Sequence, residues 1–225
     1  MTSVLQMNGV RLDVPSRTLF TKVNLSLSQG ESVALVGASG AGKTTLVNCA
    51  AGILMPTEGT VYVGDVEFTA LKPAARSALR LRSIGMIFQF SDLLPELSVV
   101  DNVALPLRFG GTAKAEARKK AESQIERLGL GGLHRAQVGN LSGGERQRVG
   151  IARATVASPR LILADEPTGM LDNANTDSVM KLLLDEVAAQ GCALLLATHD
   201  SRVANMLDRT VAVDDAKLVD RKLAS

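Results

Sequence analysis

The sequence carries almost no net charge, because 25 Lys and Arg residues are balanced by 23 Asp and Glu residues. This balance supplies no long-range field that would attract nucleic acid, so we expect no nucleic-acid partner. No apolar run is long enough to cross a bilayer, and the N-terminus MTSVLQMNGVRLDV lacks the basic and apolar segments of a secretory signal. Both absences lead us to expect a cytoplasmic chain.

Cysteine and aromatic residues are also scarce, with two Cys, no Trp, one Tyr and five Phe. Cys49 and Cys192 lie in the apolar segments VNCAAG and GCALLL, without the paired spacing of a metal site or redox motif. We therefore expect two free, buried thiols. The chain does have a hydrophobic content of 46% over 225 residues, which is enough for one sizeable core.

Short apolar runs recur along the chain and are typical of strands that are buried on both faces. Helical periodicity in AEARKKAESQIERLG and TDSVMKLLLDEVAAQG lies between the later runs. This alternation predicts an α/β fold with a parallel sheet. The runs are VALV at 33–36, IGMIF at 84–88, LILA at 161–164 and ALLLA at 193–197.

The stretch GASGAGKTT follows the first of these runs and precedes the helix-compatible LVNCAAG. It fits the pattern G-x-x-x-x-G-K-[ST], in which backbone N–H groups turn inward around phosphate oxygens and a helix N-terminus points at the same anion. Lys43 is expected to reach the β- and γ-phosphates, and Thr44 to offer its hydroxyl to Mg²⁺. The predicted nucleoside triphosphate site comprises Gly37, Ala38, Ser39, Gly40, Ala41, Gly42, Lys43, Thr44 and Thr45.

Two regions depart from the strand and helix alternation. The segments VLQMNGVRLDV, LFTKVNLSLS and TVYVGDVEF alternate like solvent-facing strands, which predicts a flanking antiparallel sheet. Residues 91–158 are helix-rich and are predicted to form an inserted helical subdomain. We therefore expect a single domain over 1–225, with a P-loop nucleotide-binding core formed by 1–90 and 159–225.

Two acidic residues, Asp165 and Glu166, follow the run LILA. A carboxylate at the end of a strand can hold Mg²⁺, and the next carboxylate can orient and deprotonate the attacking water. The alternative is a solvated acidic pair after a strand. Their position favours the site, because ligands of such sheets bind where the strands end.

The segment LSGGERQRVGIARA at 141–154 places Ser142, Gly143 and Gly144 at the start of a helix. Taken alone, it is an ordinary helix cap with Glu145 in the first turn. Its free N–H groups and the helix dipole can also bind a phosphate from outside the P-loop. That function needs a second subunit, because the P-loop of one chain already wraps its own phosphate.

These motifs, together with FQF at 88–90 and ATHD at 197–200, come in the order found in ATP-binding subunits of ABC transporters, which the whole chain resembles. FQFSDLLPELSVVDNVALPL and ADEPTGMLD are most similar to the subgroup of the lipoprotein-releasing and macrolide-exporter ATPases. The resemblance implies ATP and Mg²⁺ as cofactors and a head-to-tail homodimer around two ATP molecules. It also implies a membrane permease subunit of the MacB type and a peripheral location on the cytoplasmic face of the cell membrane.

The resemblance further implies the roles of single residues. Gln89 resembles the glutamine that senses Mg²⁺ and water, and His199 resembles the histidine that contacts the γ-phosphate, although a lone His after a strand can be structural. Asp172 corresponds to the acid that communicates across the dimer. The predicted catalytic residues are thus Glu166, His199 and Gln89; the predicted metal site is Thr44, Gln89 and Asp165; and the partner copy contributes Ser142, Gly143 and Gly144.

Three features depart from the subgroup. Met170 stands where Asn is usual, AQVGN lacks the usual proline, and Val14 stands where an aromatic residue stacks on adenine. Phe20 is the only aromatic residue before residue 37, so it is the competing candidate for the contact with the base. Leu93 and Leu94 are predicted to be exposed and to dock the membrane subunit, with core packing as the alternative.

We expect an ATPase that drives export or extraction, in which water attacks in line without a covalent enzyme intermediate. One alternative is a non-transporting ABC ATPase that regulates a membrane partner, such as a controller of cell-wall enzymes. Another is a nucleic-acid or ribosome-associated ABC protein, which the single cassette, the lack of a coiled-coil insertion and the low net charge disfavour.

Overall fold

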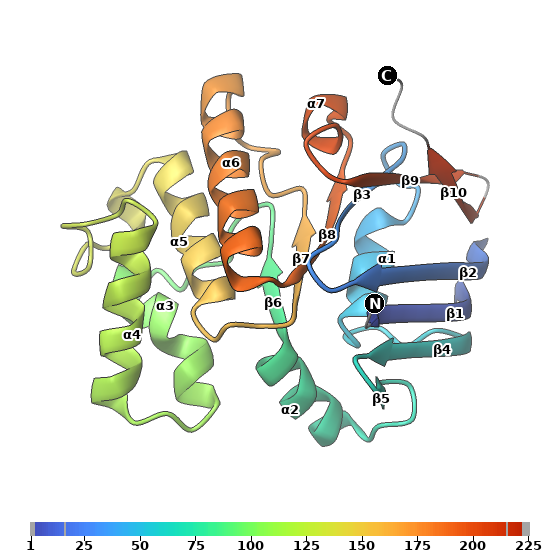
Figure 1. Cartoon of the computed structure of the whole chain (residues 1–225), viewed down its shortest axis with the longest axis horizontal. Helices are drawn as coiled ribbons and strands as arrows, with labels where there is room; N and C mark the ends of the chain where they lie inside the picture. The colour runs from blue at the N-terminus through green and yellow to red at the C-terminus, as the bar shows by residue number, and fades with distance from the viewer. Residues whose placement is uncertain (1–2, 16, 215, 222–225) are drawn as a thin grey trace.

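The computed structural model describes residues 3–15, 17–214 and 216–221 of the chain. Within them the strands form two sheets, a six-stranded sheet of order β10-β9-β3-β8-β7-β6 and a four-stranded sheet of order β2-β1-β4-β5 (Figure 1). Neighbouring strands of the larger sheet are parallel except for β10 and β9. Its strands are β3 (Ser32–Val36), β6 (Ile84–Ile87), β7 (Leu161–Asp165), β8 (Ala193–Thr198), β9 (Arg209–Asp214) and β10 (Lys217–Arg221).

The central strands are mostly apolar because their side chains alternate between two cores. On β3, Val33 and Leu35 belong to one core and Ala34 to the other. On β8, Leu195 belongs to the first core and Leu194 to the second. Successive side chains of a strand point to opposite faces, so a strand covered on both faces is apolar at most of its positions. The predicted α/β fold class, with its parallel sheet, is confirmed.

The smaller sheet is antiparallel and covers one face of the larger sheet, with α1 (Lys43–Ala50) in the same core. Its strands are β1 (Ser3–Val14), β2 (Arg17–Ser28), β4 (Glu58–Val63) and β5 (Val66–Glu67). Buried residues alternate with exposed ones along β2, as predicted for strands with one solvent face. The expected flanking sheet is confirmed, and both Cys49 and Cys192 are free, buried thiols.

The other face of the larger sheet is covered by helices, among them the helix-rich segment at the left of Figure 1. The expected helical positions Ala121, Ile125 and Leu128, and likewise Val179, Leu183 and Val187, are all buried. None of the described helices is long and apolar enough to cross a membrane. The helices are α2 (Pro73–Ser83), α3 (Val99–Phe109), α4 (Lys114–Arg127), the 3-10 helix η1 (Val138–Asn140), α5 (Gly143–Thr155), α6 (Asn173–Gln190) and α7 (Ser201–Ala204).

Candidate active site

The predicted motifs converge on one edge of the larger sheet. β3 runs into the P-loop at residues 37–42, β7 ends on Asp165, His199 follows β8 and Gln89 follows β6. Because these strands are adjacent and parallel, their carboxyl ends meet at the same edge. A cavity of about 550 Å³ opens there, and it is lined by Val14, Arg17, Leu19, Ser39, Gly40, Gly42, Lys43, Thr44, Thr45, Gln89, Glu166 and His199.

The P-loop enters α1 through Gly42, which has a φ of 98°. A Cβ at this position would lie 2.9 Å from Cζ of Phe20, so both the backbone conformation and the available space require glycine. No described side chain caps α1, and its first turn has no acidic residue, so its N–H groups are free to bind an anion. Phe20 is fully buried beneath the loop, and the alternative that its ring stacks on the base is wrong.

Lys43 lies buried at the bottom of this loop. Its Nζ donates to the carbonyl oxygens of Gly37, at 2.8 Å, and Ala38, at 3.2 Å, and lies 3.8 Å from Oε1 of Glu166. The ammonium group therefore sits between the loop that would wrap a phosphate and the carboxylate predicted to act on water. Its three donors can be transferred from backbone carbonyls to phosphate oxygens.

Asp165 has the surroundings of a metal ligand. Burial raises the pKa of its carboxyl group, while the neighbouring Thr44 hydroxyl opposes this rise. Its Oδ1 is buried and has no hydrogen-bond partner among the described residues. A buried, unpartnered carboxylate oxygen is costly unless a cation compensates for the lost water. A carboxylate and a hydroxyl, with the Gln89 amide at the same cavity, are the oxygen donors that Mg²⁺ takes, so these residues fit that ion.

Glu166 is held in an uncommon backbone conformation, with a φ of 47°. Its N–H donates to the carbonyl oxygen of Ala197 at 2.9 Å, which fixes the turn after β7 to the end of β8. Its Oε2 lies 2.9 Å from Nδ1 of His199, whose side chain is 67% exposed at the cavity mouth. Left-handed non-glycine residues cost about 1–3 kcal/mol each and cluster at functional sites. The carboxylate is thus aimed into the cavity between a lysine and a histidine.

Gln89 separates this cavity from a second one. The second cavity has a volume of about 160 Å³ and is also lined by Gly143, at the start of α5, and by Met170. A Cβ on Gly169 would lie 2.9 Å from Nε2 of Gln89, so this glycine allows the amide to pack closely against the loop after β7. Gln89 therefore faces the P-loop on one side and the start of α5 on the other.

The residues Ser142–Gly144 lie outside the P-loop cavity, on the side of the second one. Ser142 caps α5: its Oγ accepts from the N–H of Glu145, and its own N–H donates to Oε2 of Glu145 at 2.8 Å. The Ser142 hydroxyl also donates to Oε2 of Glu145 at 2.7 Å, and this bond, followed by the one from the Ser142 N–H, lowers the pKa of the Glu145 carboxyl group. This helix end therefore stands apart from the nucleotide cavity of its own chain, and its contact with a partner's phosphate stays a prediction.

The loop between β7 and α6 carries two of the residues that the resemblance singled out. Met170 is 63% exposed. Asp172 caps α6 of its own chain, accepting from the backbone N–H and the side-chain Nδ2 of Asn175, both at 2.9 Å. These bonds lower the pKa of the Asp172 carboxyl group. The described contacts of Asp172 are therefore local, and its role across a dimer stays a prediction.

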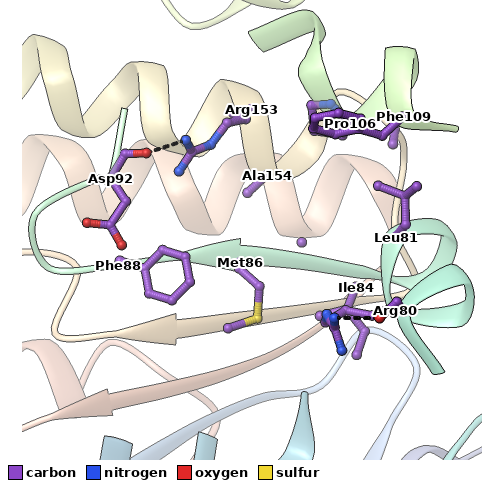
Figure 2. A pocket seen from close by; sticks show the side chains of 13 residues that line it. Arg80, Leu81, Ile84, Met86, Phe88, Asp92, Pro106, Phe109, Arg153 and Ala154 are labelled. Atoms are coloured by element: carbon purple, nitrogen blue, oxygen red, sulfur yellow. Dashed lines mark hydrogen bonds between the residues drawn. The ribbon is translucent and has the colours of Figure 1, made fainter. Parts of the chain in front are cut away.

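Gln147 and Arg153, two residues of α5 that the sequence did not single out, hold the loop that follows Gln89. Ser91 and Asp92 have φ values of 60° and 42°. Arg153 donates from Nη2 to the Ser91 carbonyl oxygen at 2.6 Å and from Nη1 to that of Asp92 at 2.7 Å, and Figure 2 shows the second of these bonds. The Ser91 hydroxyl donates to Oε1 of Gln147 at 2.6 Å. Gln147 and Arg153 lie six residues apart on α5, about 120° around the helix, and no local spacing in the sequence pointed to these contacts.

The family profile described as ABC transporter matches residues 20–169. The chain belongs to the ABC transporter family. It is 42% identical over 205 residues to the "Lipoprotein-releasing system ATP-binding protein LolD" of Pseudomonas syringae pv. tomato, covering 91% of this chain and 90% of that protein. It is 43% identical over 206 residues to the LolD of Xanthomonas campestris pv. campestris, covering 92% and 85%. The resemblance to the lipoprotein-releasing subgroup is therefore confirmed, and this ABC chain is an ATPase subunit.

Solved structures of ABC proteins agree with the fold. The "Dimeric structure of a post-hydrolysis state of the ATP-binding cassette MJ0796 bound to ADP and Pi" matches with a TM-score of 0.88 and 32% identity, covering 98% of this chain and 99% of that one. The cbiO1 protein of Clostridium perfringens also has a TM-score of 0.88, at 26% identity, covering 97% and 88%. ATP binding by this ABC chain and its membership of a membrane complex follow from the family.

Proposed function

We propose that this ABC ATPase works with a MacB-type permease at the cytoplasmic face of the cell membrane and drives export or extraction of a substrate. The relatives named as lipoprotein-releasing components share about nine-tenths of their length with the chain and support this subgroup. The observation that carries the proposal is a groove beside the Gln89 loop.

The groove has a volume of about 470 Å³ and lies between α2 and β6 on one side and α3 and α5 on the other (Figure 2). Leu81, Met86 and Pro106 give it apolar walls, and Phe109 is 73% exposed at its edge. The guanidinium group of Arg153 lies at one end of the groove. An apolar groove with charged ends suits a short amphipathic helix, such as a cytoplasmic segment of a permease.

The set of predicted docking residues changes in one detail. Leu94 is 44% exposed, as predicted for a docking residue. Leu93 is partly buried and packs against the core between the larger sheet and the helices, so the prediction that both leucines are exposed is wrong for Leu93. We therefore assign docking to Leu94 and to the exposed Phe109 of the groove.

The chemistry is proposed to depend on positioning and charge. The α1 N-terminus and Lys43 would hold the phosphates, and Glu166 would take the proton of the attacking water while His199 keeps the carboxylate oriented and reaches the γ-phosphate. Mg²⁺, held by Thr44, Asp165 and Gln89, would neutralise charge on the phosphate oxygens. Loss of the proton to Glu166 makes water a stronger nucleophile, and ADP leaves as the phosphate is transferred.

A second copy of the chain is proposed to complete each site. Ser142, Gly143 and Gly144 lie away from the P-loop cavity of their own chain, with N–H groups at a helix end that favour an anion. In a head-to-tail dimer this end would meet the γ-phosphate bound by the partner. The dimeric form of the MJ0796 structure supports this arrangement.

Co-purification from membranes tests the proposal. Leu94→Ser combined with Phe109→Ser should release the membrane subunit while ADP binding stays as in the wild type. Val66→Ser, an exposed apolar residue of β5, is the matched control and should retain the partner. Retention of the partner by the double variant would exclude the groove as the docking site. A partner that transports nothing would favour the regulatory alternative.

A further inference from the structure

The mouth of the nucleotide cavity has no aromatic side chain among its described lining residues. The wall opposite the P-loop is built by the β1–β2 hairpin, which contributes Val14, Arg17 and Leu19. Phe20 is buried under Gly42, and the hydroxyl of Tyr62 donates to Glu67 within the smaller sheet. No described Phe or Tyr ring is therefore placed to support the base of a bound nucleotide.

Arg17 occupies the position that faces this space. It is the first residue of β2 and lies directly opposite Val14 in the hairpin register. Its Nη2 donates to the carbonyl oxygen of Gly40 at 2.9 Å, so the guanidinium group spans from the hairpin to the tip of the P-loop. The side chain is exposed and lines the cavity rather than packing into a core.

The positive charge of Arg17 is not neutralised by a carboxylate in the described part of the chain. No carboxylate of the described residues forms an ion pair with Arg17, whereas the nearby Arg11 pairs with Asp13 at 2.9 Å. A guanidinium group is planar, delocalised and weakly hydrated, and it stacks on aromatic faces. Nucleotide bases offer such a face, and a neighbouring aliphatic side chain adds apolar contact.

We infer that Arg17 is the base-binding residue of this nucleotide site: its guanidinium plane stacks on the purine, and Val14 and Leu19 contact the same base. This inference rests on the ATP site of the proposed function and deepens it. Because the contact is to the face of the ring and not to its edge groups, adenine and guanine are bound alike. A pyrimidine presents a smaller face and is bound more weakly.

Equilibrium titrations of the full chain with ADP, GDP, UDP and inorganic pyrophosphate, all with Mg²⁺, test the inference. The chain does not hydrolyse these ligands, and comparing them distinguishes the contribution of the base to affinity from that of the phosphates. Arg17→Ala should weaken ADP and GDP by about 3- to 30-fold, the range expected for a cation on an aromatic face, and should leave pyrophosphate unchanged. Arg11→Ala, an arginine on the neighbouring strand that is paired with Asp13, should change neither.

Arg17→Lys distinguishes stacking on the base from the hydrogen bond to the Gly40 carbonyl oxygen of the P-loop. A lysine can still donate to the Gly40 carbonyl oxygen but has no plane, so ADP should be bound as weakly as by Arg17→Ala. Recovery of ADP affinity with lysine, an equal loss of pyrophosphate binding, or unchanged ADP binding by Arg17→Ala would each overturn the inference. A wild-type chain that fails to bind ADP would instead overturn the nucleotide site itself.

Discussion

Replacing Arg153 with Met should loosen the Gln89 loop and weaken the fold at the same time. The guanidinium group donates two short hydrogen bonds to the carbonyl oxygens of Ser91 and Asp92. The charge of Arg153 is partly removed from water, and this burial lowers its pKa. Methionine retains most of the apolar stem and removes only the donors, so the variant isolates those two bonds.

The size of the effect follows from the geometry. Hydrogen bonds to charged groups contribute about 1.5–3 kcal/mol each, and relief of backbone strain at Ser91 and Asp92 offsets part of their loss, so the free energy of unfolding should fall by about 3 kcal/mol. At about 2–4 °C per kcal/mol for a chain of this size, the midpoint of thermal unfolding should fall by about 6–12 °C. Ser91 and Asp92 are also held in left-handed conformations that cost about 1–2 kcal/mol each, so the released loop should relax.

Relaxation of this loop would displace Gln89, two residues before Ser91. A displacement of about 1 Å at a catalytic group can cost about 100-fold, so kcat should fall by about 10- to 100-fold while ADP affinity stays within about two-fold. Thermal unfolding, steady-state ATPase assays and ADP titration measure the three quantities. Arg148→Met is the matched control on the same helix, because Arg148 donates only an exposed bond to Ser178. Wild-type stability and wild-type kcat in Arg153→Met would refute the reasoning.

Four other changes test separate parts of the site. Glu166→Gln should lower kcat by about 10²- to 10⁴-fold while an ATP-bound dimer accumulates in gel filtration; wild-type turnover would exclude it as the base. Burial raises the pKa of Asp165, so the stability linked to its protonation is present below about pH 4 and lost as the pH rises through the raised pKa. Asp165→Asn should therefore raise the thermal midpoint of the nucleotide-free chain at pH 7. ADP at 100 times its Kd stabilises a chain by about 2.7 kcal/mol in total, and the variant should lose the part of this stabilisation that depends on Mg²⁺. Gly85→Ala would push a Cβ into a backbone carbonyl of α5 and should destabilise the chain by about 1–3 kcal/mol in urea unfolding, where a change under about 0.5 kcal/mol would contradict the packing. Val14→Tyr should tighten ATP binding by about 5- to 150-fold in titrations, and unchanged affinity would show that residue 14 does not face the base.

The central sheet could be predicted because its strands are covered on both faces. The strands β3, β6, β7 and β8 appear in the sequence as apolar runs, and the P-loop, Gln89, Asp165 and His199 lie just after these runs, so the order of motifs also indicated their common edge. The strands β9 and β10 were not predicted. The helix α2 was not predicted, although its apolar and polar residues do segregate around the helix; none of its residues is buried.

Contacts between distant segments could not be predicted from local patterns. Arg153 reaches Ser91 and Asp92 across some sixty residues, and no spacing within either segment indicates the partner. The burial of Phe20 beneath the P-loop could not be predicted either, because the alternation along β2 does not indicate which face of this strand is turned toward the P-loop. The structure assigns that ring to the core beneath Gly42, and this leaves the base-binding space to Val14 and Arg17.

The loop at residues 88–92 contacts three regions: the nucleotide cavity, the surface proposed for a second copy of the chain and the groove proposed for the membrane subunit. Gln89 lines the cavity for the chain's own nucleotide and the cavity beside Gly143, where a second copy is proposed to place its phosphate. Arg153 holds the same loop and lines the groove proposed for the membrane subunit. Because Arg153 binds backbone carbonyls and not side chains, any movement of α5 must shift the loop backbone itself. A permease segment that presses on the groove would therefore change the distance between Gln89 and the attacking water, with no need for a longer pathway.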